Sequence, residues 1–167
     1  MRVFALVAAL FSSTVGPVMA GPMPVLPDLP PLPTTYVSVG TDGLYAGILA
    51  GYSSNGPGGA ALGIVVGNTV HASDLLIGVE GLALVSNGDA EIEAGVRIGL
   101  PLTDALSVFG NAGLGHSTAT GAFASIGIST DFLLTSDVAL RLDYRYGHDL
   151  SGDPANHRIL GGLVRAF

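Results

Sequence analysis

In the stretch from Val138 to Asp149, VALRLDYRYGHD, large apolar side chains alternate with a set that is mostly charged. Val138, Leu140 and Leu142 share one face with two tyrosines, while Arg141 and Asp143 share the other with Arg145. Successive side chains of a β-strand point to opposite faces, so the pattern predicts a strand with one apolar and one charged face. Its length is close to the roughly 9–11 residues that a tilted membrane strand needs. If lipid covers the apolar face, the charged face must line a closed lumen.

The first residues have the order of a secretory signal peptide. Met1-Arg2 is followed by a short apolar run and by small residues that end at Ala20, and the run is too short to remain as a membrane span. We therefore predict a cleaved signal peptide over residues 1–20, with a retained anchor or a buried helix as the alternative. Residues 21–42 contain a proline-rich stretch and are predicted to form an extended periplasmic tether; a polyproline ligand is the alternative.

The composition excludes several classes of function. Only 11% of the residues are charged, against about 25% in an ordinary soluble domain, although 49% are hydrophobic and 25 residues are glycine. The net charge of -7 and the absence of lysine argue against a nucleic-acid footprint. The absence of cysteine excludes disulfides, thiol catalysis and thiolate metal sites.

Alternating segments recur along residues 43–167 and predict an all-β fold. Thr41-Asp42, Ser73-Asp74, Thr103-Asp104 and Ser136-Asp137 recur about every 30–33 residues and are expected at the base of each hairpin. Asn87-Gly88 is a hairpin signal because a type I′ turn needs positive φ twice. Pro101 is expected outside the ladder. The strands are predicted over 44–54, 60–66, 75–86, 90–100, 106–117, 122–132, 138–149 and 157–167, which gives an eight-stranded antiparallel up-and-down transmembrane β-barrel.

The face opposite the apolar one carries a nearly balanced set of charges. The alternation places five acids and four bases in the lumen: Glu80, Glu91, Glu93, Asp131, Asp143, Arg97, Arg141, Arg145 and Arg158. Buried charges need partners, and an eight-stranded barrel is just wide enough for side chains to fill it. We therefore expect a polar, mostly plugged lumen; the solvated face of a soluble sheet is the alternative.

Several segments resemble the porin-family outer-membrane barrels, in particular the opacity-like or OmpA-like eight-stranded group of Gram-negative bacteria. The resemblance covers about residues 43–167 and is carried by Gly78–Gly81, by Leu142–Tyr146 and by the terminal Phe167. It implies an outer-membrane location, contact with membrane lipid and lipopolysaccharide, and insertion by the barrel assembly machinery, which reads a C-terminal signal matched here by Gly162 and Phe167. Arg165 stands where the family usually has an aromatic or apolar residue.

The expected role is structural or one of surface interaction through the loops, with a narrow passive pore as the alternative. A lipid A-modifying enzyme would need a constellation such as His116-Ser117, whose spacing does not match the motif of those enzymes. His148, Asp149, Asp153 and His157 could hold a metal ion, but such residues are common in solvated loops. We predict neither catalysis nor a cofactor.

Overall fold

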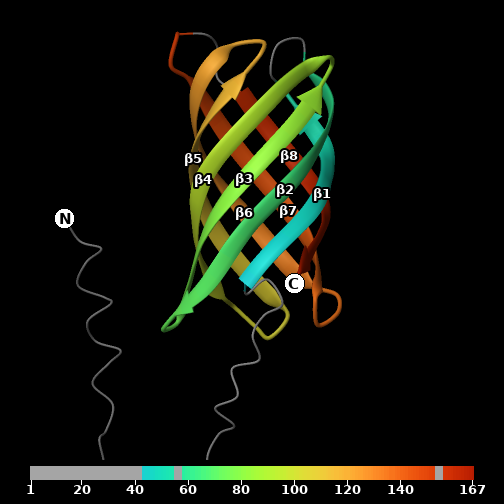
Figure 1. Ribbon diagram of the computed structural model, residues 1–167, viewed down its shortest axis with the longest axis vertical. Coiled ribbons are helices and arrows are strands. Elements are labelled where there is room, and N and C mark those ends of the chain that lie inside the picture. Colours follow the sequence, from blue (N-terminus) through green and yellow to red (C-terminus); the bar gives the residue numbers. More distant parts are fainter. Residues whose placement is uncertain (1–42, 55–57, 153–155) are drawn as a thin grey trace, which may run out of the picture. The chain divides into compact units, whose positions relative to one another are not determined.

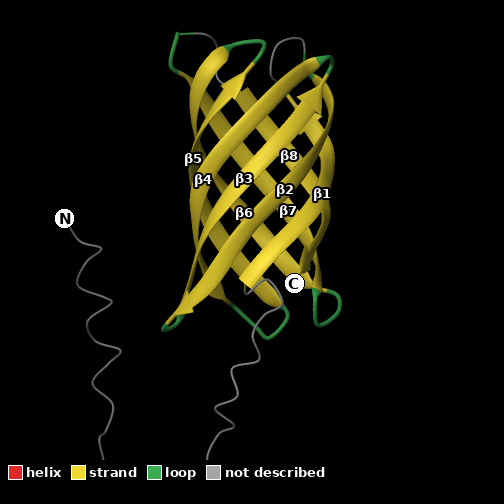
Figure 2. Cartoon of the chain, in the orientation of Figure 1, coloured by secondary structure: helices red, strands yellow, loops and turns green. Residues whose placement is uncertain are grey.

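The computed structural model describes residues 43–54, 58–152 and 156–167, so the predicted signal peptide and tether lie outside the described part. Eight strands follow one another: β1 (Gly43–Ser53), β2 (Gly59–Ala72), β3 (Leu75–Ser86), β4 (Asp89–Pro101), β5 (Leu106–Ser117), β6 (Gly121–Leu133), β7 (Val138–Asp149) and β8 (Asn156–Ala166). Each strand pairs antiparallel with the next, and β8 pairs with β1, which closes the barrel (Figures 1 and 2). The predicted all-β, eight-stranded barrel is confirmed.

The register sets the size of the barrel. When the paired residues are followed once around the sheet from Gly43, the path returns to β1 at Ser53, ten residues further along the strand. This stagger corresponds to a strand tilt of roughly 35–45°.

Within residues 43–54, 58–152 and 156–167, no helix is long and apolar enough to cross a bilayer.

The turns follow the residue types that the sequence supplies. Asn87 and Gly88 have φ values of 50° and 90°, as the predicted type I′ turn requires. At the end of the barrel where β1 begins and β8 ends (Figure 1), the Thr103 hydroxyl accepts a hydrogen bond from the Leu106 amide at 3.0 Å. Thr135 does the same for Val138 at 3.1 Å, so the hydroxyl that closes this turn belongs to Thr135 and not to Ser136.

All the predicted strand ends except one lie within one residue of the observed ends, and two of the differences are informative. β2 continues past Val66 to Ala72, because a two-residue turn joins it to β3 and every residue from Ala61 onward has a partner there. Pro101 is the last residue of β4, paired with Ser107, and not outside the ladder. The Leu102 amide donates to the Leu106 carbonyl at 2.8 Å. Bonded positions alternate along an antiparallel pair, so Pro101 falls where β5 needs no amide from it.

The barrel is apolar outside and charged inside, the reverse of a soluble domain. Leucine, isoleucine and valine side chains cover the outer face of all eight strands, and many of them are more than half exposed. Among the outward positions of these strands, Arg165 is the only aspartate, glutamate, lysine or arginine. The polar side chains of the strands are concentrated on the inner face, where most are buried.

Candidate functional site

All nine charged residues assigned to the lumen are buried inside the barrel. They come from β3, β4, β6, β7 and β8, because these strands carry charges at alternate positions on the inner face. Four of the five acids pair with a base from a neighbouring or facing strand, and Asp143 pairs with Arg145 of its own strand.

Glu80 lies at the centre of the charged cluster. Its Oε2 accepts hydrogen bonds from Arg141 at 2.6 Å, from Tyr45 at 2.6 Å and from Arg97 at 3.4 Å. Its other oxygen accepts one from Arg145. One carboxylate therefore joins three guanidinium groups that stand on two different strands.

Asp131 forms a second junction on the side of the barrel termini. Arg141 binds it through two nitrogens, with Nε 2.6 Å from Oδ1 and Nη2 2.9 Å from Oδ2. Arg97 donates to the same Oδ2 at 2.9 Å. The planar guanidinium fork makes this double contact, which an ammonium group cannot reproduce.

The network continues toward the opposite end through Arg145. This residue binds Asp143 with Nε at 2.9 Å and Glu93 with Nη1 at 2.6 Å. Glu93 in turn accepts from the Ser125 hydroxyl at 2.7 Å and from Arg158. Arg158 completes the chain by binding Glu91 at 3.2 Å. The nine charged groups thus form one connected ion-pair network along the lumen.

Aromatic rings cover the guanidinium groups of this network. The Arg97 guanidinium lies 3.5 Å from the centre of the Phe109 ring, and that of Arg158 lies 5.1 Å from the Phe123 ring. Arg141 lies 4.9 Å from the ring of Tyr45. These contacts place a cation on the negative face of a ring and shield it from water. The sequence analysis did not pick out the three rings, although each stands on the inward parity of its strand.

Each of the three rings lies directly opposite a glycine on the paired strand. Tyr45 faces Gly67, Phe109 faces Gly99 and Phe123 faces Gly115. A Cβ on any of these glycines would stand 2.3 to 2.4 Å from the ring or its hydroxyl, so only glycine leaves room for the aromatic side chain. The glycines of the inner face therefore make space for the groups that fill the lumen.

The interior also has an apolar side that the charge pattern did not predict. Tyr45 and seven aliphatic side chains pack there as one buried cluster on β1, β2, β3 and β8: Leu49, Ala61, Val65, Leu82, Leu84, Leu160 and Val164. The inner face is thus mostly apolar on β1 and β2, whereas the nine charged residues of the network lie on β3, β4, β6, β7 and β8.

The two constellations considered for chemistry are not assembled. His116 and Ser117 are consecutive in β5, with His116 on the outer face and Ser117 buried on the inner one. His148 and Asp149 diverge in the same way in β7, and the His157 ring lies against Tyr144, 3.0 Å from its hydroxyl. Asp153 lies outside the described residues. In the described part of the chain, no group of three histidine, aspartate or glutamate side chains could hold a metal ion.

The C-terminal residues close the barrel. Gly162 of β8 approaches β1 so closely that a Cβ there would stand 1.9 Å from the Ile48 carbonyl oxygen. The Phe167 amide donates to the Leu44 carbonyl at 2.9 Å, one residue beyond the end of β8, and its ring is exposed. Arg165 binds Asp137 at 2.9 Å. The Thr135 hydroxyl and this arginine hold the pKa of the Asp137 carboxyl below its usual range.

Comparison with solved structures identifies the fold. The chain superimposes on Neisserial surface protein A with a TM-score of 0.53 and 11% identity, over 74% of this chain and 96% of that one. For Ail, the attachment invasion locus protein of Yersinia pestis, the values are 0.52 and 12%, over 75% and 99%. For the N-terminal β-barrel domain of Pseudomonas aeruginosa OprF they are 0.50 and 15%, over 74% and 97%.

The chain therefore has the fold of the eight-stranded outer-membrane barrels. None of the three names describes an enzyme. No protein-family profile matches the sequence, and no curated protein matches it either.

Proposed function

We propose that the protein is an integral outer-membrane β-barrel of a Gram-negative bacterium, exported through a cleaved signal peptide, with a structural and surface-interaction role and a lumen that does not conduct. The observation that carries this proposal is the inverted distribution of side chains, with aliphatic groups outside and a connected set of charges inside. A water-soluble sheet has no reason to bury nine ionised groups while it exposes its leucines and isoleucines. A barrel whose outer face meets lipid has that reason.

The way in which the charges and the apolar cluster share the interior supports a closed lumen. The ion pairs join side chains across the barrel, and Leu49, Leu84 and Leu160 occupy the side that the charges leave. A barrel of eight strands encloses only enough space for side chains. We therefore place the function on the outside of the barrel and at its ends.

The connections at the end away from the barrel termini are the surface that would meet partners outside the cell. Several are tied together: the Asn87 side chain donates to the Gly58 carbonyl, and the Ser151 hydroxyl donates to the Thr120 carbonyl at 3.4 Å. Such ties favour a compact rim over a long binding loop. Lipopolysaccharide around this rim and surface ligands on it are the partners that we propose.

Gly162 and Phe167 are proposed to serve the assembly machinery as the C-terminal insertion signal.

Membrane residence is tested by separating membranes and running the purified protein on a denaturing gel, with and without boiling. A closed barrel resists detergent until it is heated, so we expect the protein in the outer-membrane fraction and a mobility shift on boiling. A protein that stays in the soluble fraction and shows one unshifted band would contradict the proposal.

Closure of the lumen is tested by conductance in planar bilayers. The unmodified barrel should give no stable current steps. A steady current that changes in Arg145→Ala, which alters the network, and not in Arg165→Ala, which stands on the outer face, would instead favour the narrow pore.

A further inference from the structure

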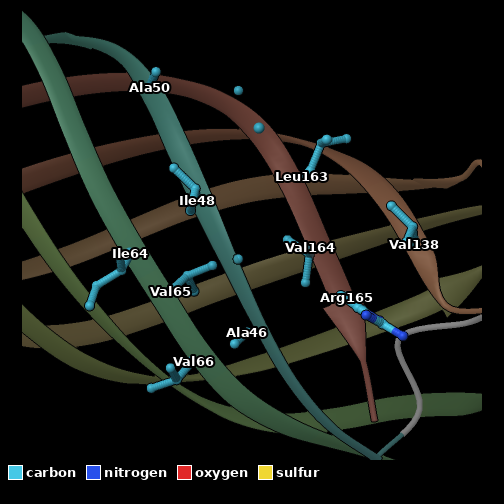
Figure 3. Close-up of a pocket in the computed structure, with 13 residues that line it drawn as sticks. Ala46, Ile48, Ala50, Ile64, Val65, Val66, Val138, Leu163, Val164 and Arg165 are labelled. Atoms are coloured by element: carbon cyan, nitrogen blue, oxygen red, sulfur yellow. The ribbon is translucent and has the colours of Figure 1, made fainter.

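The outer face of the barrel is not uniformly covered by large side chains. Where β1 and β8 meet, the outward positions Ala46, Ala50 and Gly161 are small, whereas Ile48, Ile64 and Leu163 around them are large. The small residues leave a recess of about 770 Å³ that runs along this seam (Figure 3). Its floor includes the backbone of Gly47 and Gly162, which lack side chains as well.

The recess ends at Arg165, the only aspartate, glutamate, lysine or arginine at an outward position of the eight described strands. Val66, Ala46, Arg165 and Val138 stand in one row across β2, β1, β8 and β7, at the end of the barrel where β1 begins and β8 ends. Figure 3 shows Arg165 near the end of β8, beside Val138. From Ala46 to Ala50 the recess extends for about 13 Å along β1, at 3.3 Å per residue. One leaflet of a bilayer core is about 15 Å thick.

Arg165 and Asp137 form an ion pair that presents one positive and one negative charge at this end of the recess. The arginine side chain is 64% exposed and the aspartate 42%. Nε of Arg165 donates to Oδ2 of Asp137, while Oδ1 accepts from the Thr135 hydroxyl at 3.1 Å. Among the described residues, the two terminal nitrogens of this guanidinium have no hydrogen-bond acceptor in the structure. They are available to a ligand.

From this geometry we propose that the seam binds one molecule of a zwitterionic phospholipid of the phosphatidylethanolamine type. An acyl chain lies in the recess over Ala46, Ala50 and Gly161. The phosphate accepts hydrogen bonds from the terminal nitrogens of Arg165, and the ammonium group is paired by Asp137. The inference rests on the proposed function, because it requires this end of the barrel to lie at the level of lipid headgroups.

The charges of the Arg165–Asp137 pair favour a phosphatidylethanolamine headgroup over that of phosphatidylcholine. A guanidinium–carboxylate pair matches a headgroup that carries both a phosphate and an ammonium, whereas a phosphatidylcholine ammonium is methylated and cannot donate a hydrogen bond to Asp137. A recess with one charged end and an apolar length fits an amphiphile of the same form. A second barrel packed on the seam is the rival occupant.

The chain has no tryptophan, so a single introduced tryptophan reports on the seam without background. Ile64→Trp places the probe on the β2 wall of the recess, and Val96→Trp places it near the middle of β4 as a matched control. Each full-length protein is inserted into phosphatidylcholine vesicles that contain a small fraction of phosphatidylethanolamine with brominated acyl chains, which quench tryptophan. Brominated phosphatidylcholine at the same fraction is the reference lipid.

We expect the apparent association of brominated phosphatidylethanolamine with the Ile64→Trp site to exceed that of the reference lipid by about threefold, the size of one exposed ion pair. Arg165→Gln should abolish this preference, and Ala50→Leu should lower quenching by filling the recess while Ala94→Leu on β4 leaves it unchanged. Val96→Trp should show no preference between the two lipids.

Equal quenching by the two lipids at Ile64→Trp would overturn the proposal, as would a preference that survives Arg165→Gln. Quenching at Ile64→Trp that is weak at high protein density and recovers on dilution with lipid would show that a second barrel covers the seam, and would also overturn it. Absence of quenching at Val96→Trp would mean that the barrel does not meet lipid at all, which is a failure of the proposed function and a separate result.

Discussion

Glu80 is the carboxylate on which most of the interior depends. It accepts hydrogen bonds from three arginines and from Tyr45. Glu80→Gln keeps the shape of the side chain and removes its charge, so the guanidinium groups around it lose part of their compensation. Breaking a buried ion pair on one side costs about 3–5 kcal/mol. We expect a loss of that size in the free energy of unfolding, measured by urea titration of the gel-shift band in detergent.

Asp137→Asn is the matched control for this change. It removes a carboxylate from an ion pair with an arginine in the same way, but both partners are exposed and water screens them. Its urea midpoint should stay at that of the unmodified protein. Equal shifts in both variants would mean that the interior charges are solvated and not paired as the structure has them.

At the same scale, the alternation puts the nine charges on one parity of their strands, but it does not give how they pair, and it left out Asp149, which is also buried. The alternation in β3, β4, β6, β7 and β8 assigns Glu80 and Arg97 to one face because the period is a local property. The contact of Glu80 with Arg141, however, joins residues 61 positions apart. It depends on the tilt and stagger of the closed sheet, which no single strand encodes.

At the scale of the strand, the seam between β1 and β8 depends on glycine. Gly162 and Gly161 are consecutive, yet a Cβ at Gly162 would stand 1.9 Å from the Ile48 carbonyl oxygen, whereas one at Gly161 would meet only Leu142 at 3.3 Å and the Arg141 carbonyl at 3.8 Å. Gly162→Ala should therefore force β8 away from β1 and cost at least the roughly 1–3 kcal/mol of an overpacked site. Gly161→Ala should be tolerated.

Refolding of both variants into detergent, without any assembly machinery, measures this difference as the fraction of folded band on an unheated gel. We expect Gly162→Ala to refold poorly and Gly161→Ala to refold like the unmodified chain. If Gly162→Ala refolds normally in detergent and fails only in cells, the glycine acts as an insertion signal and not as a packing requirement.

The length of β2 shows that local polarity does not predict where a strand ends. The strand predicted over residues 60–66 stops before Gly67-Asn68-Thr69, a segment with two polar residues. In the barrel, Thr69 is fully buried on the inner face and Asn68 is on the outer one, so the alternation continues. A lumen accepts polar side chains that a dry core would reject, and polarity alone is therefore a poor sign of a strand end in a barrel.

At the scale of the whole molecule, an apolar outer face distinguishes a membrane barrel from a soluble one. It can be tested by placing a charge at different depths along the barrel. Ile126, near the middle of β6, and Leu150, just beyond the end of β7, are equally exposed at 64% and 62%. In water, replacing either by arginine should have almost the same small effect on stability. In a bilayer, arginine costs about 2–4 kcal/mol at the midplane and falls to about 0–1 near the interface.

We therefore expect Ile126→Arg to lower the free energy of unfolding in lipid vesicles by about 2–4 kcal/mol, and Leu150→Arg to change it by no more than about 1 kcal/mol. Urea titration followed by the gel shift measures both. The two variants should converge when the titration is repeated in a small, fluid detergent micelle, because a micelle deforms to let the guanidinium reach water. Equal stabilities in lipid vesicles would mean that Ile126 is exposed to water, and would favour a soluble sheet over a membrane barrel.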